Sequence, residues 1–364
     1  MFKSYQFDRE IQTQSHKKGK YMFDSENITI KPKELKEVLG KFLEKRIPIL
    51  ITGTPGSGKT SIVQQVAKEK RYDCFISHPS IQSPTDYRGF PVYNVNDDRA
   101  VFKPYETLEK LVTTDRPTLF FLDDFGQALP SVQAAVQNLL SSRQVGDHKI
   151  SDDVVFVLAT NDRGQGAHVN GVLSTIKNRC GTIVELKTDP DDWLNWATQN
   201  NIRPEVTGFI RLRPDLLSKF EVTNELRNFP SPRSVAKISD DLDMDFSSDN
   251  VRFAVIAGSV GAGFAYEFES WLSLYKSMIT PQAILRDPKN AEVPKEVSAK
   301  IAVTTALAYQ VNKENLQAIM TYGERLEPEF RVKMIEYEIM GRHEELKETS
   351  EYVNWLIENQ KYLN

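Results

Sequence analysis

Residues 53–60 read Gly-Thr-Pro-Gly-Ser-Gly-Lys-Thr and fit the phosphate-binding pattern G-x-x-x-x-G-K-[ST] at every fixed position. The apolar run 47–52 before the motif predicts a buried strand, and residues 61–68 after it place apolar side chains on one face of a helix. A strand, a glycine-rich turn and a helix in this order are the context that the pattern requires. The motif therefore predicts a sheet whose strand end presents a loop to a phosphate.

The loop and the start of its helix are expected to bind a nucleotide. The residues expected to take part are Gly53, Thr54, Pro55, Gly56, Ser57, Gly58, Lys59, Thr60 and Ser61. Backbone N–H groups of such a loop point inward, and the helix N-terminus adds partial positive charge, so a polyphosphate is held by dipoles as well as by the Lys59 ammonium. The Thr60 hydroxyl is placed to bind Mg²⁺.

A second chemical signal follows downstream, where the apolar run 118–122 ends in Asp123 and Asp124. A strand that ends in acidic residues after a phosphate loop is typical of the Walker B arrangement. Asp123 is expected to hold Mg²⁺ directly or through water. Asp124 is expected to orient or deprotonate the water that attacks the terminal phosphate.

The apolar run 154–160 predicts another buried strand, and it ends at Asn161. We expect this strand to lie beside the one that carries Asp123, so that Asn161 reaches the terminal phosphate or the attacking water. Taken alone, an asparagine after a strand is usually a cap or a turn former.

These runs predict an α/β fold with a parallel five-stranded sheet and helices on both faces. The strands are expected at residues 47–52, 74–77, 118–122, 154–161 and 182–186. From Asp189-Pro190 onward the strand signals largely vanish, and amphipathic helical patterns replace them. The expected division is an N-terminal tail (1–24), a nucleotide-binding core (25–188), an all-α lid (189–285) and a C-terminal helical extension (286–364).

Two short hairpins are predicted within the nucleotide-binding core. Residues 78–91 contain many helix breakers, and the runs 92–95 and 99–102 that follow flank an Asn-Asp-Asp turn. Residues 141–145 and 148–150 form a second candidate hairpin around Gly146-Asp147. The length of the first insertion favours a functional role over a plain connector.

The chain has a net charge of −4, with 46 basic and 50 acidic residues, which gives no bulk electrostatic case for nucleic acid but leaves a local patch open. Its two cysteines, Cys74 and Cys180, favour a reducing compartment over a disulfide scaffold. Histidines and cysteines show no metal-ligand spacing. No apolar run approaches the ~18 residues of a membrane span, and the charged N-terminus is unlike a signal peptide. The composition predicts a cytoplasmic protein without a membrane span.

Together these features resemble an AAA+ ATPase. The motifs come in the family's order: the phosphate loop, then residues 121–124, 158–161, 178–179 and 231–233. Within that family the chain resembles the MoxR branch. The pointers are residues 84–91 (Pro-Thr-Asp-Tyr-Arg-Gly-Phe-Pro), the hairpin after them, and residues 144–149. The resemblance covers roughly residues 30–240.

The resemblance implies roles for three polar residues. Asn161 corresponds to the residue called sensor 1, and Arg233 to sensor 2, which reports the nucleotide state to the lid. Arg179 corresponds to the arginine finger, which is offered to a neighbouring protomer's nucleotide; a guanidinium is permanently charged and such fingers accelerate phosphoryl transfer ~10³-fold or more. The nearest alternatives for the finger are Lys177 and Arg163, and the plainer alternative for each arginine is a surface ion pair.

The resemblance also implies ATP with Mg²⁺ as cofactors, a homo-oligomeric ring (commonly a hexamer), and a client protein, often one with a von Willebrand A-type domain. ATP is favoured over GTP because residues 312–315, Asn-Lys-Glu-Asn, miss the last position of a guanine-reading Asn-Lys-x-Asp. The family usually has Asp-Glu where this chain has Asp123-Asp124, so a weak to moderate ATPase is expected. Two alternatives stay open: a nucleic-acid motor, and an ATP-binding switch with slow turnover.

Overall fold

The computed structural model describes residues 29–95, 98–161, 171–221 and 226–363. Its main sheet has six parallel strands in the order β1-β10-β2-β9-β6-β3. The strands are β1 (Thr29–Ile30), β2 (Ile49–Gly53), β3 (Asp73–Ser77), β6 (Thr118–Leu122), β9 (Val154–Ala159) and β10 (Thr182–Leu186). The predicted sheet of five strands is therefore one strand short. The missing edge strand β1 has two residues, too few to produce a periodic pattern.

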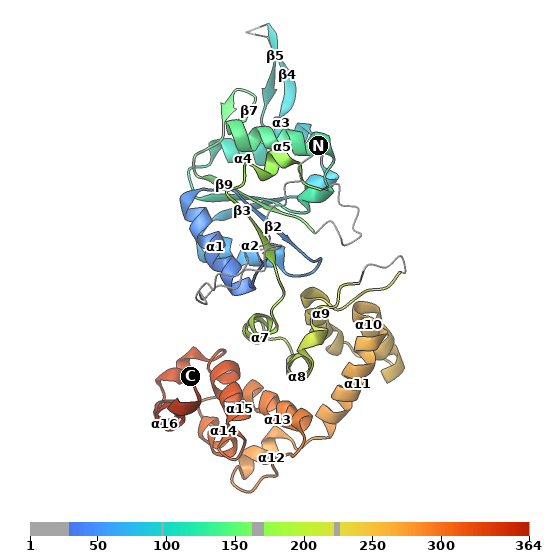
Figure 1. Cartoon of the computed structure of the whole chain (residues 1–364), viewed down its shortest axis with the longest axis vertical. Coiled ribbons are helices and arrows are strands. Elements are labelled where there is room, and N and C mark those ends of the chain that lie inside the picture. The colour runs from blue at the N-terminus through green and yellow to red at the C-terminus, as the bar shows by residue number, and fades with distance from the viewer. Residues whose placement is uncertain (1–28, 96–97, 162–170, 222–225, 364) are drawn as a thin grey trace, which may run out of the picture.

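Side chains alternate along each strand, so every central strand contributes to two apolar layers. Leu119 and Phe121 of β6 pack with α1 (Pro32–Lys45) and α2 (Lys59–Glu69). Phe120 and Leu122 pack on the opposite face. The helices of that face are α4 (Thr107–Thr113), α5 (Pro130–Ser142) and α6 (Ser174–Lys177). Figure 1 shows α1 and α2 on one side of the sheet and α4 and α5 on the other. This double cover confirms the predicted layers and explains the continuous apolar runs of the strands.

Both predicted hairpins are confirmed. β4 (Phe90–Asn94) pairs with β5 (Arg99–Lys103), and β7 (Gln144–Val145) pairs with β8 (His148–Lys149), each antiparallel. The connection before β4 contains η1 (Pro79–Ile81) and α3 (Thr85–Arg88), and η2 (Phe125–Gln127) follows β6. In Figure 1 the β4–β5 hairpin projects from the sheet on the side away from the helical half of the chain.

The helical half begins after β10. Its helices are α7 (Pro190–Gln199), α8 (Pro204–Leu212), α9 (Pro232–Leu242), α10 (Asp249–Val260), α11 (Ala262–Ser277), α12 (Pro281–Arg286), α13 (Val297–Tyr309), α14 (Leu316–Gly323), α15 (Pro328–Val332) and α16 (Ser350–Asn359). Shorter turns are η4 (Pro214–Leu216), the π-helix η5 (Lys333–Ile339), η6 (Glu344–Glu348) and η7 (Gln360–Tyr362). None of the helices in the described residues combines the length and apolar character that a membrane crossing requires.

Two long helical stretches of the C-terminal half are interrupted in the structure. Residues 249–277 divide into α10 and α11 at Gly261, which has φ 86°. Residues 310–315 separate α13 from α14. Helix α13 contributes Ala302 to one apolar cluster of the helical half and Val303 to the other. Because the two clusters share a helix, the boundary near residue 285 stays a prediction.

Phe121→Ala tests the central packing of the sheet. The Phe121 side chain has 0% exposure between two helices, so its removal should lower the free energy of unfolding by ~3–5 kcal/mol. Denaturant unfolding followed by circular dichroism measures this loss. Ile81→Ala is the matched control, because Ile81 is 84% exposed and its truncation should change stability by less than ~0.5 kcal/mol. Equal losses in the two variants would contradict the layer assignment.

Candidate functional site

The loop between β2 and α2 has the geometry of a phosphate cradle. Gly58 precedes the helix with φ 98°, a backbone conformation that suits glycine. The first turn of α2 has no acidic side chain, so its N–H groups keep their partial positive charge toward the loop. The Ser57 hydroxyl is buried and has no hydrogen-bond partner in the described part of the chain. A buried donor without a partner costs free energy, which a bound phosphate oxygen would recover.

Lys59 joins the loop to a neighbouring strand. Its Nζ donates to the carbonyls of Gly53 at 2.8 Å and Thr54 at 2.9 Å, and to Asn161 Oδ1 at 2.9 Å. Strand β9 ends at Ala159, two residues before Asn161, and lies beside β6, as predicted, with β2 on its other side. The ammonium and the amide therefore meet at the carboxyl edge of the sheet, where ligands of open α/β sheets bind.

Thr60 and Asp123 offer a matched pair of hard oxygen ligands. The Thr60 hydroxyl donates to Asp123 Oδ2 at 2.6 Å, and Asp123 is 6% exposed. Mg²⁺ is commonly bound by one or two carboxylates together with substrate phosphates, so this donor set fits the ion. The described residues contain no group of three or more His, Cys, Asp or Glu side chains that could hold a metal ion. The pair accordingly suits a metal that arrives with a nucleotide.

Asp124 lies beside this pair in an unusual backbone conformation. Its φ is 52°, in the left-handed region, and its N–H donates to Asp123 Oδ1 at 3.0 Å. Aspartate tolerates the left-handed region better than most residues, which gives a physical reason for Asp here. Burial, and then the charge of Asp123, raise the pKa of Asp124 above its ordinary value, while Lys59 and His78 oppose the rise. No sequence pattern singled out His78.

The segment predicted as a lid (residues 189–285, called the lid below) packs directly on the loop through the start of α9. A Cβ on Gly56 would lie 2.6 Å from the Ser231 hydroxyl, so only glycine allows this approach. The Arg233 N–H donates to the Gly56 carbonyl at 3.2 Å. Ser231 caps α9 by accepting from the Ser234 N–H at 3.2 Å. Helix α9 thus begins on the phosphate loop and holds the Arg233 backbone there, while its side chain is exposed.

A cavity of about 480 Å³ opens between the loop, the helices and the lid. Six of its lining residues are Lys33, Ser57, Trp193, Trp196, Arg233 and Tyr337. The volume is within the ~300–1,000 Å³ typical of small-molecule sites. Sequence patterns placed Trp193 and Trp196 on a helix but gave no sign that they line a cavity shared with the loop.

Arg179 lies apart from these groups. Its guanidinium donates to the Thr175 carbonyl at 2.7 Å and to the Ser141 hydroxyl. Neither partner belongs to the phosphate loop or to the acidic pair. The competing Lys177 is exposed at the end of α6, and Arg163 lies outside the described residues.

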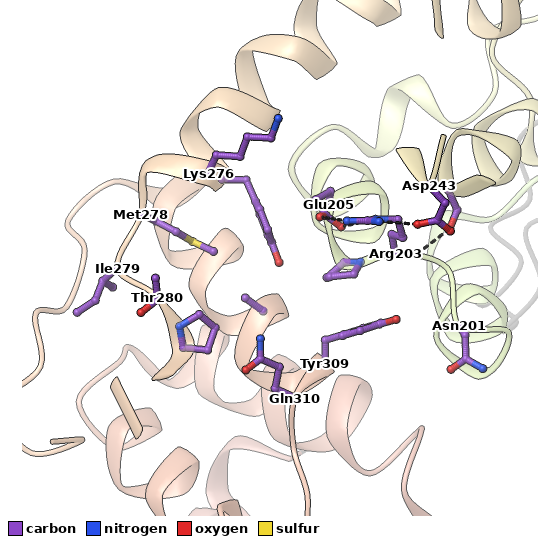
Figure 2. Close-up of a pocket in the computed structure, with 15 residues that line it drawn as sticks. Asn201, Arg203, Glu205, Asp243, Lys276, Met278, Ile279, Thr280, Tyr309 and Gln310 are labelled. Carbon is purple, nitrogen blue, oxygen red and sulfur yellow. Dashed lines mark hydrogen bonds and ion pairs between the residues drawn. The ribbon is translucent and has the colours of Figure 1, made fainter. Parts of the chain in front are cut away.

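A second cavity, of about 490 Å³, is lined by residues in or next to α8, α9, α11, α12 and α13 (Figure 2). Arg203 lies in it between two carboxylates, with Nη2 donating to Glu205 at 2.7 Å and Nη1 donating to Asp243 at 2.6 Å. The two carboxylates outweigh the single guanidinium charge, so Arg203 links the start of α8 to the end of α9 and offers no anion site.

Residues 49–187 match the protein family described as ATPase family associated with various cellular activities (AAA). The chain is similar to the solved structure of the Thermotoga maritima RuvB Holliday junction branch migration motor, with 14% identity and a TM-score of 0.38 over 70% of this chain and 80% of that chain. It is also similar to a candidate ATPase of Cytophaga hutchinsonii, with 14% identity and a TM-score of 0.35 over 93% and 91%. None of the curated proteins compared with the chain matches it.

Asp124→Asn should raise the midpoint of thermal unfolding at neutral pH, because it removes a carboxylate whose charged form burial disfavours. The folded-state pKa of Asp124 is above the unfolded value of ~3.9, so the cost of its charge is present at neutral pH and vanishes on acidification toward that value. The gap between variant and wild type should therefore shrink between pH 7 and pH 4.

Asp152→Asn is the matched control for this measurement. Lys149 lowers the pKa of Asp152, so its carboxylate stabilises the folded chain and its loss should lower the midpoint at neutral pH. If the difference in unfolding midpoint between Asp124→Asn and wild type widens on acidification, the raised pKa of Asp124 is contradicted.

Proposed function

We propose that the chain, whose residues 49–187 match the AAA ATPase family, binds ATP with Mg²⁺ and hydrolyses it to ADP and phosphate. The main support is the convergence of Lys59 with Asn161 and of Thr60 with Asp123 at one edge of the sheet. A cation, a metal-binding pair and a polar amide are the groups that phosphoryl transfer needs, since its catalysis rests on positioning and on stabilising charge.

The residues have separate parts in the proposed reaction. Asp124 accepts a proton from the attacking water as the new oxygen–phosphorus bond forms and the bond to the ADP oxygen breaks. Asn161 orients that water, and the Lys59 ammonium turns from the loop carbonyls to the phosphate oxygens. Bound Mg²⁺, held by Thr60 and Asp123, would supply neutralising charge.

Arg179 is proposed to complete the site of a neighbouring copy in a ring. Its partners in the chain are on α5 and α6, away from the chain's own phosphate loop. Ser141 and Thr175 are neutral, so no carboxylate among them holds the guanidinium back from a phosphate. This arrangement supports a finger supplied in trans, as resemblance to AAA+ rings implies.

The finer assignment, to a MoxR-like machine that remodels a client protein, is supported by the β4–β5 hairpin. Phe90 is 59% exposed, Tyr93 58% and Val95 80%, an unusual density of exposed apolar side chains on one short ribbon. We propose that this ribbon contacts the client protein. The resemblance favours a client that has a von Willebrand A-type domain.

A slow-turnover ATP switch is the second candidate, and Asp124 is the observation that favours it. Aspartate is one methylene shorter than the glutamate usual in the family, so its carboxylate reaches less far toward the attacking water. In that case ATP binding assembles the ring, and hydrolysis contributes little to the protein's function.

Lys59→Ala should weaken MgATP binding by ~10-fold to ~100-fold, because charge-assisted hydrogen bonds contribute ~1.5–3 kcal/mol each. Isothermal titration calorimetry measures the affinity. Lys68→Ala is the matched control, since Lys68 is an exposed lysine on the same helix and should leave affinity unchanged. Unchanged affinity in Lys59→Ala would refute the proposed site.

Arg179→Ala should lower ATP turnover ~10³-fold without changing the affinity for ATP. Mixing Arg179→Ala chains with Asp124→Asn chains should restore part of the turnover. In such a ring the site of an Arg179→Ala chain keeps its own Asp124 and receives the intact Arg179 of its Asp124→Asn neighbour. Lys177→Ala is the control and should stay active.

Failure of the mixture to recover, with both variants assembling normally, would contradict a finger in trans. A wild-type chain that assembles on ATP but shows no turnover would favour the switch.

A further inference from the structure

We propose that Tyr337, in the C-terminal helical region, contacts the nucleoside of the bound nucleotide and strengthens its binding. This inference rests on the proposed function, because it assigns a further binding residue to the same site. Sequence patterns placed Tyr337 in an amphipathic helix and gave it no role. Tyr337 and Gly341 line the same cavity as Gly56, Ser57 and Gly58 of the phosphate loop.

The direction of a bound nucleotide follows from which groups line the cavity. Gly56, Ser57 and Gly58 line it, whereas Lys59, Thr60, Asp123 and Asn161 do not. The reacting end of the triphosphate must lie with the latter groups, at the sheet edge. The phosphates therefore cross the loop, and the nucleoside extends into the cavity.

The cavity walls beyond the loop suit an aromatic base. Trp193 and Trp196 of α7 line them, and α7 packs against η5, the π-helix that carries Tyr337. The Tyr337 side chain is 58% exposed, so its ring is available to a ligand. Aromatic rings on which bases stack are a common means of binding nucleobases without reading their edges.

The π-helix is firmly anchored beside Tyr337. Glu338 is 4% exposed and forms an ion pair with Arg211 of α8, whose side chain is 14% exposed. A buried charge pair is costly to separate, so it holds the backbone of η5 against the lid. Tyr337 thus comes from a fixed element, and π-helical turns are frequent at functional sites.

Gly341 keeps the end of this element close to Tyr337. A Cβ on Gly341 would lie 2.5 Å from the Tyr337 carbonyl oxygen, closer than real Cβ contacts. Gly341→Ala must therefore displace the backbone that carries Tyr337. This variant perturbs the position of the ring without changing its chemistry.

The test compares ATP with inorganic tripolyphosphate, which has the phosphates but no nucleoside, by calorimetry on the full chain with Mg²⁺. Tyr337→Ala should weaken ATP ~5-fold to ~100-fold, the range for one stacked base, and leave tripolyphosphate within ~2-fold. Tyr337→Phe should bind both ligands like wild type, because stacking uses the ring. Gly341→Ala should weaken ATP in the same selective way.

Two controls separate this inference from the proposed function. Tyr266→Ala removes a 66% exposed tyrosine outside the cavity and should change neither affinity. Lys59→Ala should weaken both ligands, and its failure to do so would overturn the proposed site itself. Suppose that Lys59→Ala weakens both ligands as expected, but Tyr337→Ala weakens both equally or weakens neither. The contact between Tyr337 and the nucleoside is then refuted, while the proposed ATPase function stands.

Discussion

The contact between the Lys59 ammonium and its three oxygen partners joins the parts of the molecule on which the site depends. Gly53 ends β2, Thr54 begins the turn after it, and Asn161 follows β9. The two strands pair in parallel, so their carboxyl ends meet at one edge. Any change in this pairing would move Asn161 relative to Lys59 and would also shift Asp123, since β6 pairs with the other side of β9.

A second constraint is the close approach of lid and loop. Gly56 accepts a hydrogen bond from Arg233 and leaves room for Ser231, which also begins α9. Ser231 therefore both contacts the loop and caps α9, and the Gly56 carbonyl holds the backbone of Arg233 at the cavity. A displacement of the lid and a change at the loop are consequently coupled through direct contact.

Two elements of the helical half, α7 and η5, form the wall of the cavity beyond the phosphate loop. Helix α7 lines the cavity with tryptophan side chains, and η5 packs on α7 while Glu338 pairs with Arg211. The last part of the chain thereby reaches the site through one packed element. This continuity gives the C-terminal region a physical route to respond to whatever occupies the cavity.

Local patterns were sufficient to predict the loop, the acidic strand end, both hairpins and the α/β layers. Each of these depends on residues adjacent in the chain, such as the glycine spacing of the loop or the apolar run before Asp123. The prediction was wrong where the signal was too short: the edge strand β1 has two residues, too few to produce a periodic pattern.

The chemical groups of the site and their order along the chain can be predicted from spacing and periodicity, because both are local properties. Which of these groups meet depends on contacts between distant segments. That Ser231 approaches Gly56 and that Tyr337 shares a cavity with the loop both follow from how segments far apart in the chain pack together. Such packing depends on side-chain shape across segments far apart in the chain, and no local pattern encodes it.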